Sequence, residues 1–101
     1  TISVDELAEE IEKVFLVDVR EEYEYEICHL SNAYLMPLES LKEAVAEVPR
    51  DRKVVVYCHH GSRSEDAIRL LSSEYGFTNL LSLDGGINEW AEQIDNSLER
   101  Y

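Results

Sequence analysis

The sequence predicts one α/β domain over residues 1–101, with a mainly parallel central sheet and helices on both faces. Two observations support this fold class. Short apolar runs of strand length alternate along the chain with segments of helical spacing. Such alternation is typical of parallel sheets whose connecting helices cover both faces. In addition, no apolar run approaches the roughly 20 residues that a membrane span requires.

The first half of the chain predicts two helices and two strands, each marked by a local signal. A capping box of Ser3 and Glu6 favours a helix that begins at Val4. The elements expected after it are a buried strand over 14–17 that ends at Asp18, a short helical turn over 21–26, and a strand over 33–36 that stops before Pro37.

The second half continues the alternation. The expected elements are a helix over 38–48 closed by Pro49, a strand over 53–57, a helix over 64–75 with Gly76 as its C-cap, a strand over 80–83, a short helix over 87–94 anchored by Trp90, and an irregular segment over 96–101. The strand over 53–57 contains three consecutive valines, which makes it the strongest strand signal in the chain.

Three polar interruptions follow the predicted strands, over residues 18–20, 58–63 and 84–86. Because the carboxyl ends of parallel strands meet at one edge of a sheet, we expect these interruptions to lie close together. Ligands and substrates of open α/β sheets bind at that edge. The sequence therefore predicts a functional site there.

The charge balance limits the classes of partner. Nine basic residues stand against 22 acidic ones, for a net charge of −13. Such a chain repels nucleic acid phosphates and anionic lipid, so neither is an expected partner. Residues 50–69 are the exception, with five basic and three acidic residues around Cys58. Either the acidic surface only maintains solubility, or the basic stretch handles an anion or a basic partner.

Cys58 has the surroundings of an activated thiol. It ends a strand, and a short loop leads from it to a helix whose free N–H groups can point at an anion. Gly61 permits a positive φ, and Arg63 supplies a permanent charge. A helix terminus contributes at most about 2 kcal/mol to an anion. The loop amides and Arg63 are therefore expected to surround the sulfur and stabilise the thiolate.

Two other interpretations of Cys58 remain open at this point. It could be a small apolar residue that ends a buried strand, which is common for free cysteines. It could also bind a metal together with His59 and His60, but adjacent residues rarely aim at one ion and the ligand spacing of zinc sites is absent. We therefore expect no metal and no cofactor.

Several motifs occur in an order and spacing that resemble the rhodanese-like domain family over nearly the whole chain. They are Asp18-Val19-Arg20-Glu21, Cys28-His29-Leu30-Ser31-Asn32-Ala33, Cys58-His59-His60-Gly61-Ser62-Arg63-Ser64, and Gly76-Phe77 with Leu83-Asp84-Gly85-Gly86-Ile87 and Trp90. Residues 94–101 further resemble the end of rhodanese domains that close ubiquitin-activating-like adenylyltransferases. The start at Thr1 rather than Met suggests processing or excision from a longer protein.

This resemblance implies a three-layer rhodanese-like fold and a sulfurtransferase activity. The Cys58 thiolate would take a sulfane sulfur from thiosulfate or from a protein persulfide, such as that of a cysteine desulfurase. The resulting persulfide would pass its outer sulfur to an acceptor thiol or a sulfur-carrier protein. The implied substrate- and persulfide-binding residues are His59, His60, Gly61, Ser62, Arg63 and Ser64. Asp18 and Arg20 would either position the loop through a salt bridge or hydrogen bonds, or form a purely structural pair.

The wider setting is also expected from the sequence. We expect a cytoplasmic monomer, because no targeting signal is visible and the chemistry needs a reduced cysteine. The net charge of −13 disfavours long-range capture of small anions, so a protein persulfide is expected to be a better donor than thiosulfate.

The second motif departs from the family pattern, and two rival functions remain. Cys28 stands where the family has glycine; it is either a buried filler or a resolving thiol for the Cys58 persulfide. Asn32 tolerates the left-handed backbone that the altered turn needs. A Cys–Arg loop phosphatase is one rival, but such loops have five intervening residues, whereas four separate Cys58 from Arg63. A non-catalytic recognition module of this fold is the other rival; such modules usually lack the cysteine.

Overall fold

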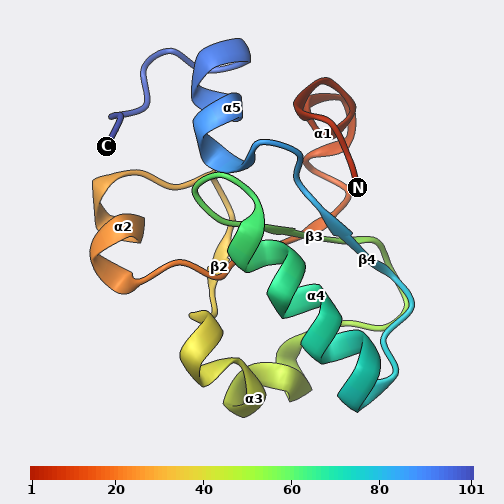
Figure 1. The fold of residues 1–101 in the computed structure, drawn as a ribbon. Helices are drawn as coiled ribbons and strands as arrows, with labels where there is room; N and C mark the ends of the chain where they lie inside the picture. The colour runs from red at the N-terminus through yellow and green to blue at the C-terminus, as the bar shows by residue number, and fades with distance from the viewer.

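A sheet of four parallel strands runs through the middle of the computed structural model, which describes residues 1–101 (Figure 1). The strand order is β2-β1-β3-β4, with β1 at Phe15–Asp18, β2 at Tyr34–Leu35, β3 at Val54–Tyr57 and β4 at Leu80–Ser82. In the register of the sheet, Val17 of β1 lies opposite Tyr34 of β2 and Val56 of β3, and Val56 lies opposite Ser82 of β4. The all-parallel arrangement places every strand's carboxyl end at the same edge.

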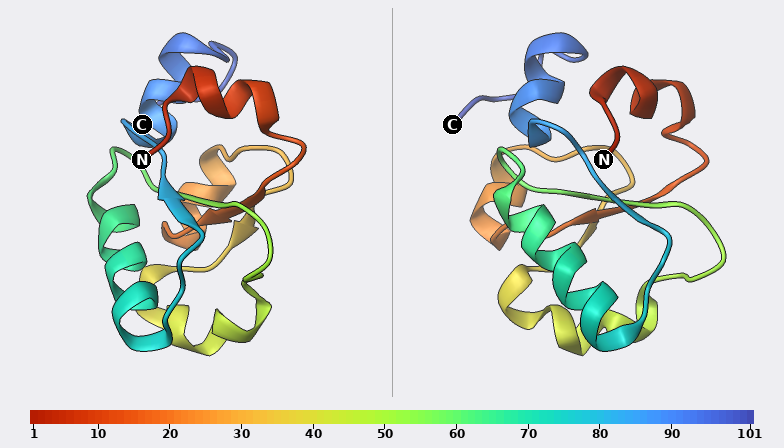
Figure 2. Two further views of the ribbon diagram at one scale, coloured as in Figure 1. Left: turned by 90° about the vertical axis from the view of Figure 1, so that its right-hand side faces the viewer. Right: turned by 45° about the vertical axis from the view of Figure 1, so that its right-hand side comes forward.

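Helices cover both faces of the sheet, as the sequence predicts (Figures 1 and 2). Alternate residues of β3 divide the core, because Val55 and Tyr57 join one hydrophobic cluster while Val54 and Val56 join the other. The first cluster packs under α1 (Val4–Glu10) and α5 (Gly86–Gln93), and the second under α3 (Leu41–Ala44) and α4 (Ser62–Tyr75). None of these helices combines the length and apolarity needed to cross a membrane.

Several local signals give the expected structure. Ser3 caps α1, and Glu6 returns the hydrogen bond to complete the predicted capping box. Trp90 is buried and anchors α5 on the first cluster. Gly76 ends α4 in the left-handed conformation at φ 71°, as predicted for a C-cap. A further short helix, α2 (Glu22–Ile27), occupies the position of the expected turn.

The segment 38–48 is not the single helix that its apolar spacing predicts. It consists of the 3-10 turn η1 (Leu38–Ser40), one turn of α-helix in α3, and the 3-10 turn η2 (Val45–Glu47). Ser40 and Ala44 have ψ angles of 17° and 0°, which interrupt the α-helical hydrogen bonds and favour bonds three residues apart. Leu41 and Val48 are still buried, and Leu38 and Val45 are half-buried against the same cluster.

Helix α4 begins at Ser62, two residues before the predicted start. Gly61 takes the N-cap position with φ 127°, a conformation that side chains with a Cβ rarely adopt. The loop after Cys58 is therefore shorter and more tightly curled than the sequence pattern indicates.

The three polar interruptions meet at the carboxyl edge, as predicted. The Val19 N–H donates to Tyr57 O at 3.1 Å, which joins the end of β1 to β3. At the start of α5, the Ile87 N–H donates to Cys58 O at 2.9 Å and the Asn88 N–H to His59 O at 3.1 Å. The first turn of α5 thus holds the outer backbone of the Cys58 loop.

The close approach of α5 to the loop leaves no room for a Cβ at Gly86. This predicts that Gly86 and Gly76 differ in how much a substitution destabilises the protein. A Cβ on Gly86 would collide with the carbonyl oxygens of Cys58 and His59, whereas a Cβ on Gly76 meets nothing within 4 Å. Both have positive φ, so alanine costs about 1–2 kcal/mol of backbone strain at either position. We expect Gly86→Ala to lose about 1–3 kcal/mol beyond the loss in Gly76→Ala, measured by urea unfolding. Equal losses would show that α5 does not pack tightly on the loop.

Candidate active site

Cys58 lies at the carboxyl end of β3, where its side chain is enclosed by the following loop. The residue is 1% exposed. Its Sγ accepts hydrogen bonds from the Gly61 N–H at 3.0 Å and the Ser64 N–H at 3.4 Å. The thiol therefore contacts two backbone donors as well as the hydrophobic cluster under α3 and α4.

The loop retains further donors. The backbone N–H groups of His59, His60, Ser62 and Arg63 donate to no protein acceptor. They belong to the loop and the first turn of α4, where such groups are available to an anion. The loop can therefore serve an outer sulfur atom or an oxyanion without breaking any internal hydrogen bond.

A pair of buried hydroxyl groups lies behind the sulfur. Ser64 Oγ is 3.7 Å from Cys58 Sγ and donates to Gly61 O at 2.9 Å. Ser82 Oγ lies 2.7 Å from Ser64 Oγ. Because Ser64 has one hydroxyl proton and directs it at Gly61, Ser82 is the donor of this pair. Sequence reasoning missed Ser82, although a lone hydroxyl in the apolar strand β4 is a usable signal.

The Arg63 side chain pairs with a carboxylate and donates no hydrogen bond to the sulfur. Its Nη1 and Nη2 donate to Glu24 Oε1 at 2.7 Å and Oε2 at 3.0 Å, which is a bidentate pair. The Glu24 side chain is 4% exposed and needs a cation to remain ionised. The hydrogen bonds from Arg63 hold the pKa of Glu24 at about 2. The expected role of Arg63 toward the Cys58 sulfur stays a prediction, since the hydrogen bonds of its terminal nitrogens go to Glu24.

Asp18 and Arg20 form the salt bridge that was one of the expected arrangements. Arg20 Nη2 lies 2.6 Å from Asp18 Oδ2, and both side chains are completely buried. The same nitrogen donates to Cys28 O at 2.7 Å. Burial lowers the pKa of Arg20, but the hydrogen bonds to Asp18 and Tyr101 outweigh that effect and raise it. The pair fixes the end of β1 to the segment that follows α2.

Tyr101 connects this buried pair to the Cys58 loop, which the sequence did not predict. Its hydroxyl accepts from Arg20 Nη1 at 2.7 Å and donates to Glu24 Oε2 at 2.8 Å. Burial raises the pKa of Tyr101 to about 12. The segment 96–101 is irregular, as expected, but its end is docked on the site. The resemblance of residues 94–101 to a family ending was the only signal for it.

His59 and His60 lie side by side at the outside of the loop. The His59 ring stacks on the Tyr101 ring with centroids 3.9 Å apart, and the His60 ring lies 4.0 Å from it on a tilt. Burial and the neighbouring His60 lower the pKa of His59. A neutral imidazole is therefore the main form of His59 at neutral pH.

The two cysteines belong to opposite faces of the sheet. Cys28 packs in the cluster under α1 and α5, whereas Cys58 packs in the cluster under α3 and α4. Both thiols are free and buried. This separation is the packing expected of a filler residue and gives no support to a direct Cys28–Cys58 disulfide. Asn32 has φ 67°, as predicted for the altered turn.

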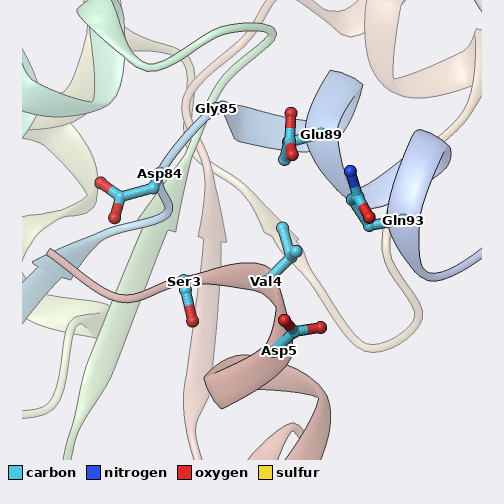
Figure 3. Close-up of a pocket in the computed structure, with 7 residues that line it drawn as sticks. All are labelled: Ser3, Val4, Asp5, Asp84, Gly85, Glu89 and Gln93. Atoms are coloured by element: carbon cyan, nitrogen blue, oxygen red, sulfur yellow. The ribbon is translucent and has the colours of Figure 1, made fainter.

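A surface hollow of about 450 Å³ lies between α1, the end of β4 and α5 (Figure 3). Asp5, Asp84 and Glu89 supply three carboxylates to its wall. No residue of the Cys58 loop lines it. The hollow is therefore separate from the thiol, and its acidic wall is unsuited to an anionic substrate.

The fold and the loop together define the class of protein: a parallel α/β domain with a cysteine held by backbone donors at the carboxyl edge of its sheet. The family model of the rhodanese-like domain matches residues 3–93. The chain therefore belongs to the rhodanese-like domain family.

Similar proteins agree with this assignment. The chain is 36% identical over 91 residues to the probable adenylyltransferase/sulfurtransferase MoeZ of Mycobacterium tuberculosis, covering 88% of this chain and 23% of that protein. It is 35% identical over 101 residues to the adenylyltransferase and sulfurtransferase uba4 of Ogataea parapolymorpha, covering 99% and 25%. It thus spans about a quarter of these relatives. A crystal structure of a rhodanese-related protein from Thermoplasma volcanium has a TM-score of 0.85 and 34% identity, covering 93% of this chain and 92% of that one.

The Glu24–Arg63 pair predicts an acid-dependent loss of stability. The pKa of Glu24 is about 2 in the folded protein against an ordinary value of 4.5. A lowered folded-state pKa stabilises the fold above the unfolded value, and this contribution is lost as pH falls from about 4.5 to about 2. It amounts to at most about 3 kcal/mol. Chemical unfolding of Glu24→Gln should therefore show a flatter pH dependence in this window than the unsubstituted protein.

Glu26→Gln is the matched control, because Glu26 is an exposed residue of the same helix. Its unfolding free energy should follow that of the unsubstituted protein throughout the window. Identical pH profiles for the two variants would contradict the importance of the Glu24–Arg63 pair.

Proposed function

We propose that this domain is a sulfurtransferase that carries a sulfane sulfur on Cys58. The supporting observation is the loop itself: two N–H groups donate to Sγ, and four more are free around it. This number of preorganised donors suits a terminal sulfur anion, which has no proton of its own to donate.

Two displacement steps account for the transfer. In the first, the Cys58 thiolate attacks the sulfane sulfur of the donor, a new sulfur–sulfur bond forms, and the donor leaves as sulfite or as a thiolate. In the second, an acceptor thiolate attacks the outer sulfur, and the Cys58 thiolate is the leaving group. Each step forms and breaks one bond to the transferred sulfur, so the cycle needs no metal, cofactor or external oxidant.

Sulfur transfer fits the loop better than phosphate hydrolysis. Only four residues separate Cys58 from Arg63. A ring of amides closed over four residues is narrow for a tetrahedral phosphate, and the Arg63 guanidinium that a phosphatase would need is paired with Glu24. The relatives MoeZ and uba4, which are both named as sulfurtransferases, support the same choice.

A protein persulfide is the donor that the charges favour. The net charge of −13 repels small anions, and Glu24 neutralises the cation nearest the loop. A cysteine desulfurase brings its sulfur as a covalently bound group, so long-range attraction of a free anion is unnecessary. The acceptor of the sulfur is a thiol or a sulfur-carrier protein. Both cysteines are free, and a reducing compartment such as the cytoplasm suits this chemistry.

The direct test is the intact mass after incubation with a persulfide-loaded cysteine desulfurase. We expect a gain of one sulfur atom that is absent in Cys58→Ser and retained in Cys28→Ser, because Cys28 lies on the other face of the sheet. A Cys58 that stays unmodified in a folded protein would instead favour a recognition module. Hydrolysis of p-nitrophenyl phosphate that depends on Cys58 would favour a phosphatase.

The role of Glu24 predicts a change in donor preference. Glu24→Gln removes the negative charge that holds Arg63 and leaves a guanidinium available to thiosulfate. We expect the KM for thiosulfate to fall about fivefold, the factor that corresponds to roughly 1 kcal/mol for a partly exposed charge. Thiocyanate formation in the presence of cyanide measures it.

Glu26→Gln separates this local effect from the change in net charge, because it alters the charge equally at an exposed position. Its KM for thiosulfate should match that of the unsubstituted protein. A similar fall in both variants would show that the overall negative charge, and not the Glu24–Arg63 pair, limits thiosulfate binding.

A further inference from the structure

We propose that Tyr101 is a positioning residue for sulfur transfer, holding both Arg63 and His59 in place at the outside of the Cys58 loop. The inference rests on the proposed function and adds to it a residue that lies far from the loop in sequence. Tyr101 does not touch the sulfur, so its effect on transfer is exerted through the side chains that it contacts.

The hydroxyl of Tyr101 joins two ion pairs into one chain of hydrogen bonds. Arg20 Nη1 donates to it at 2.7 Å, and it donates to Glu24 Oε2 at 2.8 Å. The direction is fixed, because a guanidinium only donates and a carboxylate only accepts. A phenol is suited to this place since it does both. Phenylalanine would leave the Arg20 nitrogen and the Glu24 oxygen each without this partner.

This chain of hydrogen bonds reaches the Cys58 loop through Arg63. Glu24 accepts from both terminal nitrogens of Arg63 and from the Glu21 N–H at 3.0 Å, and Tyr101 supplies the fourth donor. With four donors the carboxylate has one well-defined orientation, which in turn fixes the guanidinium. Arg63 belongs to the first turn of α4 and carries one of the free N–H groups of the site.

The ring of Tyr101 makes the second contact. It stacks on the half-buried His59 ring with an interplanar angle of 9°. The His59 imidazole forms no hydrogen bond with the protein, so stacking on Tyr101 and on His60 determines its orientation. His59 directly follows Cys58, so its orientation shapes the surface next to the sulfur that a donor or acceptor protein would contact.

The segment that carries Tyr101 is fixed along α5. Leu98 packs against the hydrophobic cluster under α1 and α5, and Arg100 Nη2 donates to Asn88 Oδ1 at 2.8 Å. The same helix binds the carbonyl groups of Cys58 and His59 through its first turn. Figure 1 shows this last segment leaving α5 on the side where α2 lies. The backbone and the side chains of the loop are therefore both held by the region over 86–101.

The first test compares Tyr101→Phe and Tyr101→Ala in sulfur transfer from a persulfide-loaded cysteine desulfurase. We expect the KM for the loaded donor to rise about threefold in Tyr101→Phe, which keeps the ring but loses the charged hydrogen bonds. It should rise about tenfold or more in Tyr101→Ala, which also loses the stack. The kcat should change less than twofold in both, because neither variant alters the donors to Cys58. Tyr23→Phe, at a 65% exposed tyrosine of α2, should leave both constants unchanged.

The second test does not depend on sulfur transfer. Stacking on Tyr101 should move the His59 ring protons upfield in the NMR spectrum, and this shift should persist in Tyr101→Phe and disappear in Tyr101→Ala. Unchanged KM values together with an unchanged His59 spectrum in Tyr101→Ala would overturn the proposal. So would an equal fall in kcat in both variants with KM preserved.

The two tests also separate this inference from the proposed function. If the unsubstituted protein forms no Cys58 persulfide by intact mass, sulfur transfer is wrong, while the His59 spectrum still decides whether Tyr101 positions that ring. If Tyr101→Ala does not fold, Tyr101→Phe retains the ring and still tests the hydrogen bonds. A KM unaffected in folded Tyr101→Phe would then limit Tyr101 to its stack, contrary to the proposal for Arg63.

Discussion

A buried negative charge on Glu24 organises the site. The side chain is 4% exposed, and removing a carboxylate from water is unfavourable unless charged and polar donors replace the solvent. Four donors do so here, from Arg63, Tyr101 and the Glu21 backbone. Because both terminal nitrogens of Arg63 donate to Glu24, the one cation of the loop donates no hydrogen bond to the sulfur. This need for donors explains why the Tyr101 hydroxyl lies against Glu24 and why Arg63 donates to Glu24 and not to Cys58.

With no hydrogen bond from Arg63, the Cys58 sulfur accepts hydrogen bonds only from backbone N–H groups. The N–H donors of Gly61 and Ser64 are set by the curl of the loop, and the first turn of α5 holds that curl from outside. Backbone donors cannot rotate away as an arginine side chain can, so the environment of the sulfur is preorganised by the fold. Their partial charges are small and local. In the proposed transfer they would favour a terminal sulfur anion at short range without drawing free anions from solution.

The fold and the loop were predictable because their signals are local. Strand runs, the Ser3 capping box and the glycines at 61 and 76 act through residues a few positions apart. The side-chain partners were not predictable, since Arg63 meets Glu24 across 39 residues and Tyr101 meets Arg20 across 81. Burial of a carboxylate is a tertiary property that no pattern around Glu24 reveals. The 3-10 turns over 38–48 were not predictable although their signals are local, because apolar spacing does not distinguish a 3-10 helix from an α-helix.

The two ion pairs are better explained by conformational specificity than by stability. Taking Asp18, Arg20 and Glu24 out of water costs free energy that the pairing recovers only when every donor and acceptor is satisfied, so apolar residues of equal volume would stabilise a domain as well. Apolar packing, however, could not fix the direction of a guanidinium beside the Cys58 loop. The polar chain from Asp18 to Arg63 does so, because each hydrogen bond in it runs in only one direction. Its position at the carboxyl edge of the sheet, against the Cys58 loop, agrees with the proposed role of Tyr101 in sulfur transfer.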